Sequence, residues 1–243
     1  MKLSILIPSK NEPLLKTTLA DIKAHKELDT EVLWMEDSGI GQRATTNLLA
    51  DKATGDYLMK LDAHCSLAQG FDRALLEEMD THTILAPLLL PLDPLTWAIN
   101  GKKQMAQFVF DTNLVMQHAE GSAGETMCLQ GSCFVVAKDT YWKWNLGDLS
   151  MPSWGGQGVE LGIKAFLNGG TCRTTDKTYY GHVFRHSDTD FPYNRGDNPG
   201  KIANQELVRR YKNASLAPLI RKFNLPADWT EQDVHLLTPA SVV

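Results

Sequence analysis

The sequence predicts a single-domain α/β protein in which helices cover both faces of a doubly wound, mostly parallel sheet. Apolar runs typical of buried strands alternate three times with helical patterns in about the first 80 residues. The length of 243 residues suits one large α/β domain. The chain is 43% hydrophobic and 22% charged, which is ordinary for a soluble globular protein. It shows no internal repeat or low-complexity linker.

The hydrophobic pattern predicts each element in turn. Residues 3–8 form an Ile- and Leu-rich run ended by a proline, as expected of a buried parallel strand. Asn11-Glu12-Pro13 then begins a helix whose apolar residues recur at helical spacing to about Lys26. By the same reasoning we expect strands at 31–35, 57–61, 83–90, 131–137 and 179–184, and helices at 43–52, 71–79, 157–168 and 198–212.

Polar residues follow the early strands at the point where each one ends. Right-handed crossovers bring the carboxyl ends of parallel strands to one edge of the sheet, where ligands bind. Asp62 and His64 follow one such strand and, two residues apart on extended chain, point to the same side. A carboxylate and an imidazole suit a divalent ion such as Mn²⁺. The alternative is that Asp62 caps a turn and His64 is a packed core residue.

Two more polar clusters follow the first two strands. Ser9-Lys10-Asn11-Glu12 could contact a nucleotide, or Asn11 could simply cap the helix. At the end of the second strand, Asp37 could accept a hydrogen bond from a uracil N–H, or belong to a plain turn. Arg43 could pair with a phosphate or with a nearby carboxylate.

Two segments later in the chain also suit a ligand site. Glycines in Trp154-Gly155-Gly156-Gln157-Gly158-Val159-Glu160 allow close backbone approach and lead into a helix N-terminus, which favours anions. The alternative is a plain glycine turn, with Glu160 in the first helical turn. In Gly181-His182-Val183-Phe184-Arg185, His182 could complete a metal site or be a core histidine.

The order of these motifs resembles a known family. Ile-Pro-Ser-Lys-Asn-Glu, Glu-Asp, Leu-Asp-Ala-His-Cys, Trp-Gly-Gly-x-x-x-Glu and Gly-His-Val-Phe-Arg occur in sequence. The set resembles the catalytic domain of polypeptide N-acetylgalactosaminyltransferases and related family 2 glycosyltransferases of the GT-A fold. The resemblance covers about residues 3–212, so we expect residues 1–212 to form a GT-A catalytic domain and residues 213–243 a C-terminal helix and tail packed on it.

The resemblance implies roles for the matching positions. Asp62, His64 and His182 would hold Mn²⁺, and Asp37 would read the uracil of a UDP-sugar. Arg43 and Arg185 would neutralise carboxylate or diphosphate charge, and the loop after Arg185 would close on the donor. The implied donor-binding residues are Pro8, Ser9, Asn11, Glu12, Asp37, Arg43, Asp62, Trp154, Gly155, Gly156, Phe191 and Tyr193, and the catalytic candidates are Gln157, Glu160 and Arg185.

The chain departs from the family pattern at Gln157 and Gly158. The family has Glu and Asn at these positions, and inverting relatives carry a catalytic aspartate near Gly158, so the obvious general base is missing. We therefore expect transfer with retention of configuration. The acceptor hydroxyl would belong to a protein Ser or Thr, a glycan or a hydroxymethylated DNA base. Alternative functions are a nucleotidyltransferase or a non-catalytic nucleotide-sugar-binding protein.

Charge, apolar runs and cysteine spacing indicate which partners and which cellular compartment to expect. The net charge of −5 gives no support to a dedicated nucleic-acid binder or to a membrane-surface protein. No apolar run approaches the roughly 20 residues that span a bilayer, and the N-terminus lacks signal-peptide features, so we expect a cytoplasmic protein. The resemblance adds the expectation of a bacterial or phage enzyme, because the family's membrane anchor and C-terminal lectin domain have no counterpart in this sequence. The four cysteines form no CxxC pair; we expect free thiols, with a zinc site as the alternative.

Overall fold

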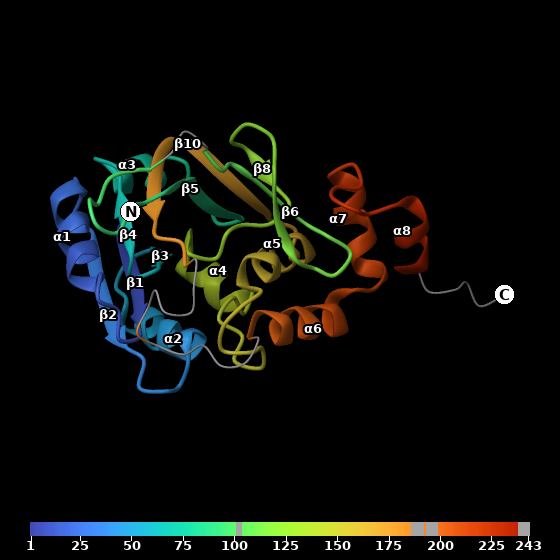
Figure 1. Cartoon of the computed structure of the whole chain (residues 1–243), viewed down its shortest axis with the longest axis horizontal. Coiled ribbons are helices and arrows are strands. Elements are labelled where there is room, and N and C mark those ends of the chain that lie inside the picture. The colour runs from blue at the N-terminus through green and yellow to red at the C-terminus, as the bar shows by residue number, and fades with distance from the viewer. Residues whose placement is uncertain (101–103, 186–191, 193–198, 238–243) are drawn as a thin grey trace.

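The computed structural model describes the chain except for residues 101–103, 186–191, 193–198 and 238–243. It contains a mixed sheet of eight strands in the order β2-β1-β3-β9-β5-β10-β4, with β8 paired to β10 (Figure 1). A separate hairpin joins β6 and β7. The strands are β1 (Leu3–Ser9), β2 (Glu31–Glu36), β3 (Tyr57–Leu61), β4 (Cys65–Leu67), β5 (Thr83–Pro91), β6 (Gln107–Phe110), β7 (Met116–Ala119), β8 (Glu125–Thr126), β9 (Cys133–Ala137) and β10 (Thr171–His182).

The first half of the sheet is parallel, as the sequence predicts. β1 pairs in parallel with both β2 and β3, and β5 pairs in parallel with β10. β9 runs antiparallel between β3 and β5, and β4 runs antiparallel to β10. The carboxyl ends of β1, β2 and β3 therefore meet at one edge.

Helices cover both faces of this sheet, because strand residues alternate between the two faces. Ile5 of β1 packs in one apolar cluster with Ile22, whereas its neighbour Leu6 packs in another with Leu49. Ile22 and Leu49 lie on different helices. The helices are α1 (Leu15–His25), α2 (Gln42–Lys52), α3 (Phe71–Leu76), α4 (Lys138–Lys143), α5 (Gln157–Leu167), α6 (Pro199–Tyr211), α7 (Ala217–Lys222) and α8 (Glu231–Leu237), with a 3-10 turn at Ala214–Leu216.

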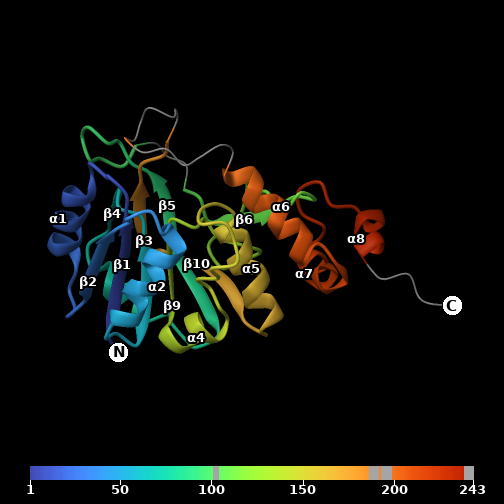
Figure 2. The same ribbon diagram turned by 90° about the horizontal axis from the view of Figure 1, so that it is seen from below.

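The C-terminal helices α6, α7 and α8 lie at the end of the molecule opposite α1 (Figures 1 and 2). Leu219 and Val234 are buried in the same apolar cluster as Ile5. The indole nitrogen of Trp229 donates a hydrogen bond of 3.0 Å to the Phe110 carbonyl. Residues 216–234 thus pack on the main body.

The last strand of the sheet is longer than its sequence pattern predicts. We expected it to start at Tyr179, but β10 begins at Thr171 and contains an irregularity between Thr175 and Tyr179. Buried threonines in its first half hide the apolar signal; Thr174, for example, donates from its hydroxyl to the Ala106 carbonyl at 2.7 Å. The pattern also missed the short β4 and the β6–β7 hairpin, which are too brief for a periodic signal.

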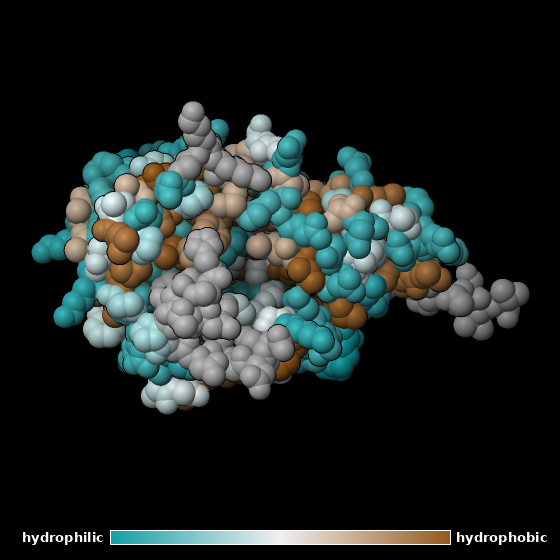
Figure 3. Space-filling model, in the orientation of Figure 1, coloured by the Kyte–Doolittle hydropathy of each residue, from teal (hydrophilic) through white to brown (hydrophobic). Residues whose placement is uncertain are grey.

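The exposed surface is mixed in character. On the face shown in Figure 3, hydrophobic residues are scattered between hydrophilic ones. Among the residues that the structure describes, no helix has the length and apolar character needed to cross a membrane. All four cysteines are buried free thiols.

Candidate active site

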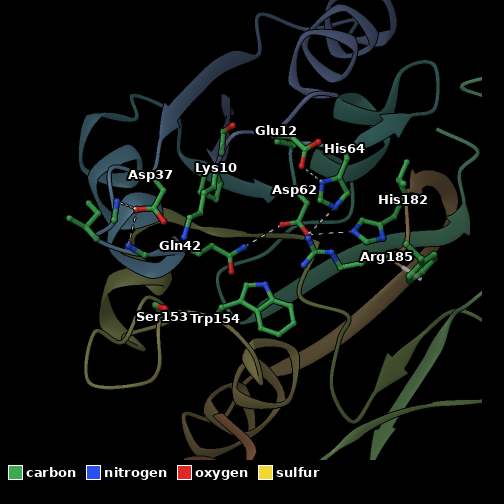
Figure 4. A pocket seen from close by; sticks show the side chains of 18 of the residues that line it. Lys10, Glu12, Asp37, Gln42, Asp62, His64, Ser153, Trp154, His182 and Arg185 are labelled. Carbon is green, nitrogen blue, oxygen red and sulfur yellow. Dashed lines mark hydrogen bonds and ion pairs between the residues drawn. The ribbon is translucent and has the colours of Figure 1, made fainter. Parts of the chain in front are cut away.

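A cavity of about 390 Å³ opens at the edge where the parallel strands end. Figure 4 shows Asp62 in its middle, with Gln42 on one side, His64 and His182 on the other, and Asp37 farther along. Contributions come from the loops after β1, β2, β3 and β10, the start of α2 and the loop before α5. Its polar lining is made by Ser9, Lys10, Glu12, Asp37, Gln42, Asp62, His64, Gln130, Ser153, His182 and Arg185.

The three predicted metal ligands come together. One ligand atom from each of Asp62, His64 and His182 lies within 4.8 Å of the other two. The Nε2 atom of His182 is 3.4 Å from Oδ2 of Asp62, and Nε2 of His64 is 4.0 Å from the same oxygen. The two imidazole rings are 4.9 Å apart, centroid to centroid.

The short strand β4 is what joins these residues. It begins three residues after Asp62 and pairs antiparallel with the end of β10, with Cys65 opposite His182. The amide of Val183 also donates to the His64 carbonyl at 3.2 Å. Two histidines distant in sequence therefore become neighbours through backbone pairing.

Hydrogen bonds orient two of the three ligands. Nδ1 of His64 lies 3.0 Å from Oε2 of Glu12, which leaves the Nε2 side of the ring facing Asp62. Asp62 is held through Oδ1, which pairs with the Lys60 ammonium and accepts a bond of 3.3 Å from Gln42. Carboxylates behind a histidine and donors on a carboxylate are the usual supports of metal ligands.

The charges around Asp62 keep it ionised. Burial alone would raise its pKa, but the Lys60 ammonium and the two imidazoles hold the pKa well below the ordinary value. Burial also lowers the pKa of His182, which favours the neutral imidazole that binds metals.

The residues present fit a divalent ion. Both ring nitrogens of His182 are buried; Nε2 faces Oδ2 of Asp62 at 3.4 Å, whereas Nδ1 makes no hydrogen bond to the part of the protein that the structure describes. Buried polar atoms without partners are rare in native proteins and call for an explanation such as an ion. One carboxylate and two imidazoles suit Mn²⁺ or Zn²⁺.

Asp37 lies at the far end of the same cavity. Its Oδ1 accepts bonds of 2.9 Å from the amides of Gly39 and Gly41, which shape the turn into α2. Pro8 and Ser9 line the cavity beside it. Asn11, in contrast, is an exposed residue outside the lining, and its amide donates to Glu36 at 2.6 Å.

A second hollow of about 300 Å³ adjoins the first. The two share Gln42, Asp62, Gln130 and Trp154 as lining residues. The second hollow is also lined by Lys60, Gly131, Ser132, Gly155, Gly156, Gln157 and Gly158 and, from other elements, by Val115, Met116, Val159, Gly200 and Asn204.

Two predicted site residues lie beneath the cavities and do not line them. Glu160, a catalytic candidate, is only 1% exposed and forms ion pairs of 2.6 Å with Arg43 and Lys164. Arg43, expected at the donor, also donates to the carbonyls of Pro152 at 2.9 Å and Gly155 at 3.4 Å. Arg43 therefore holds the loop that carries Trp154, and Glu160 holds Arg43 in place. Both charges are used inside the protein and do not face the cavities.

Two residues predicted to bind the donor fall in a part of the chain that the structure does not describe, and two residues of the site were not predicted. Phe191 and Tyr193, expected in a closing loop, lie outside the described residues. Sequence reasoning missed Lys60 and Gln42; the only signal was a lysine inside the otherwise apolar run Tyr57-Leu58-Met59-Lys60-Leu61.

No family model matches the chain. Among curated proteins, "Putative polypeptide N-acetylgalactosaminyltransferase 13" of Drosophila melanogaster is 30% identical over 210 residues, covering 76% of this chain and 37% of that protein. Human polypeptide N-acetylgalactosaminyltransferase 15 is 27% identical, covering 73% of this chain and 30% of that protein. The chain thus spans about a third of the length of these relatives. Both come from animals, so they lend no support to the bacterial or phage origin that we expected.

Solved structures show the same architecture. A crystal structure of GalNAc-T7 with UDP, GalNAc and Mn²⁺ matches 96% of this chain and 53% of that one, with a TM-score of 0.73 at 18% identity. Staphylococcus aureus TarS in complex with UDP matches 98% of this chain and 70% of that one, with a TM-score of 0.55 at 14% identity. The chain therefore has the GT-A glycosyltransferase fold and is similar to polypeptide N-acetylgalactosaminyltransferases over most of its own length.

Proposed function

We propose that the chain is a metal-dependent glycosyltransferase that moves a hexose or N-acetylhexosamine from a UDP-sugar to a hydroxyl acceptor. The observation that carries this proposal is the convergence of Asp62, His64 and His182 in a cavity that also contains Asp37. The names of the animal relatives, and the UDP, GalNAc and Mn²⁺ in the similar GalNAc-T7 structure, support the same donor class and ion.

Each part of the cavity would take one part of the donor. Asp37 would accept a hydrogen bond from the uracil. Asp62, His64 and His182 would hold the divalent ion, which when bound neutralises charge on the leaving diphosphate. Arg185 lines the same cavity and would add a fixed positive charge near the phosphates. The sugar would then extend past Asp62 into the second hollow.

Retention of configuration is supported by the packing at Gly158. A Cβ atom at this position would lie 1.7 Å from the Leu129 carbonyl oxygen, so a catalytic aspartate does not fit there. Glu160 is turned away toward Arg43 and Lys164. Among the described residues that line the second hollow, Asp62 is the only carboxylate, and it is assigned to the metal. The departing diphosphate oxygen would therefore accept the proton of the acceptor hydroxyl.

The acceptor class is the least constrained part of the proposal. A protein Ser or Thr is favoured by the word "polypeptide" in the names of the relatives. A basic patch on α6 gives hydroxymethylated DNA little support, because Arg209 and Arg210 both pair with Glu206, and Arg210 also donates to the Ser150 carbonyl at 2.7 Å. A glycan acceptor stays a prediction.

A donor panel assayed with Mn²⁺ tests the proposal. We expect release of UDP from one UDP-sugar, and we expect it to be faster with a peptide acceptor than without. An NMR spectrum of the product should show the same anomeric configuration as the donor sugar. In a separate reaction that supplies UTP and a sugar 1-phosphate instead, release of pyrophosphate would indicate a nucleotidyltransferase. Tight donor binding with no turnover on peptide, glycan or hydroxymethylated DNA would indicate a binding protein, and an inverted linkage would refute retention.

A further inference from the structure

Lys60 is a buried cation directly beside the candidate metal site. It lies on β3, is 1% exposed, and its neighbours Leu58, Met59 and Leu61 are apolar. Its ammonium donates to the Gly131 carbonyl at 2.8 Å and forms an ion pair with Asp62. A buried ammonium is costly unless it is paired, and Asp62 supplies the opposite charge at this position.

The pair divides the two oxygens of Asp62 between different partners. Oδ1 faces Lys60 and Gln42, whereas Oδ2 faces the Nε2 atoms of His182 and His64 at 3.4 and 4.0 Å. Figure 4 shows Asp62 between Gln42 on one side and the two histidines on the other. A single carboxylate oxygen is thus offered to an ion held by the histidines.

The same pair removes negative charge from the site. Asp62 is the only carboxylate in the three-residue group, and the Lys60 charge offsets it. Glu12 forms a hydrogen bond with Nδ1, on the other side of the His64 ring. Asp62 and Lys60 together therefore offer an entering divalent cation no net charge, whereas a bound diphosphate would bring its own negative charge.

From this arrangement we propose that Lys60 couples metal binding to nucleotide binding. Lys60 fixes Asp62 as a one-oxygen ligand and repels the ion, so that the ion is held firmly only when a nucleoside diphosphate is present. This inference rests on the proposed function for the identity of its ligands. Because coupling between two sites is reciprocal, metal and diphosphate strengthen each other by the same factor.

Titration of Mn²⁺ by calorimetry, with and without UDP, tests the coupling. In the wild type we expect UDP, but not uridine, to raise Mn²⁺ affinity. In Lys60→Met, which keeps the length of the side chain and removes its charge, Mn²⁺ alone should bind at least about tenfold more tightly, since a unit charge this close to a divalent ion costs more than that. The enhancement by UDP should shrink by a similar factor.

Lys138→Met is the matched control. Lys138 follows β9 at the opposite end of that strand from Gly131, and its ammonium donates to the Ala53 carbonyl at 2.6 Å, so the variant removes the same charge away from the site. It should titrate like the wild type. Thermal melts with and without Mn²⁺ give a second readout, in which Mn²⁺ should raise the Tm of Lys60→Met more than that of the wild type.

Unchanged or weaker Mn²⁺ affinity in folded Lys60→Met would overturn the inference while leaving the proposed function intact. Wild-type protein that binds neither UDP nor Mn²⁺ would overturn both. If Lys60→Met does not fold, Lys60→Gln, which keeps a donor without the charge, takes its place with the same expected direction.

Discussion

The Nδ1 atom of His64 and the Oε2 atom of Glu12 lie 3.0 Å apart, although 52 positions separate the two residues in sequence. Glu12 is itself fixed at the start of α1, because its other oxygen accepts the Leu14 amide at 3.1 Å. The carboxylate therefore sets the ring orientation of His64 and places the proton on Nδ1, which leaves Nε2 as the ligand atom.

Glu12→Ala should weaken Mn²⁺ binding about 10- to 100-fold, since His64 loses the partner that orients it. Calorimetric titration in the presence of UDP measures this. Glu77→Ala removes an exposed glutamate beyond the end of α3 and should have no effect. Full Mn²⁺ affinity in Glu12→Ala would show that Glu12 does not position His64.

His182→Ala should abolish the dependence of UDP binding on Mn²⁺, because two ligands would hold the ion weakly. UDP affinity measured with Mn²⁺ and with EDTA should become equal in the variant. The control is His235→Ala on α8, at an exposed position, which should keep the difference. A metal effect that survives in His182→Ala would count against the ligand role.

Glu160→Gln should destabilise the fold by about 3–5 kcal/mol, because it leaves Arg43 and Lys164 buried without their shared carboxylate. Urea unfolding measures the loss. The exposed pair between Arg221 and Glu231 supplies a control, since Glu231→Gln should cost far less. Equal losses in the two variants would mean that the buried pairs do not stabilise the protein.

Gly158→Ala should lower the free energy of unfolding by at least about 1–3 kcal/mol, because the added methyl group overlaps the Leu129 carbonyl and must push α5 away. Gly200→Ala is a matched control: among the described residues its added carbon would meet only the Trp154 ring, at 3.8 Å, and alanine favours the α6 helix. If Gly158→Ala were as stable as Gly200→Ala, position 158 would have room for a side chain.

Asp148 should contribute to stability against acid. Burial opposes ionisation of this carboxyl, but Ser150 and Lys164 outweigh it and hold the pKa at about 2, below the ordinary 3.8. A depressed folded-state pKa adds stability above the unfolded value, and that stability is lost as the pH falls from about 4 toward 2. Asp148→Asn should therefore lose less Tm over this range than the wild type, whereas Asp139→Asn at an exposed site of α4 should follow the wild type.

Much of the sheet and part of the site could be predicted from local pattern. The predicted strand 57–61 matches β3, and the predicted helix 43–52 differs from α2 by one residue. Hydrophobic period is a local property, so it survives without knowledge of the fold. Asp62 and His64 do come near each other, but residues 63 and 64 form a turn between β3 and β4 and not the extended chain on which the prediction rested. The role of His182 came from the family resemblance and not from its own surroundings.

The sequence by itself determined the α/β class and the polar residues that end the parallel strands, because both depend on neighbours a few positions apart. Only the tertiary structure decided three contacts: the pairing of β4 with β10 brings His64 next to His182, Glu12 contacts Nδ1 of His64, and Lys60 pairs with one oxygen of Asp62. It also turned Glu160 inward to Arg43. These contacts join residues that are far apart in the chain. A buried charge needs an opposite charge as its partner, and the identity of that partner depends on the fold and cannot be predicted from a local pattern.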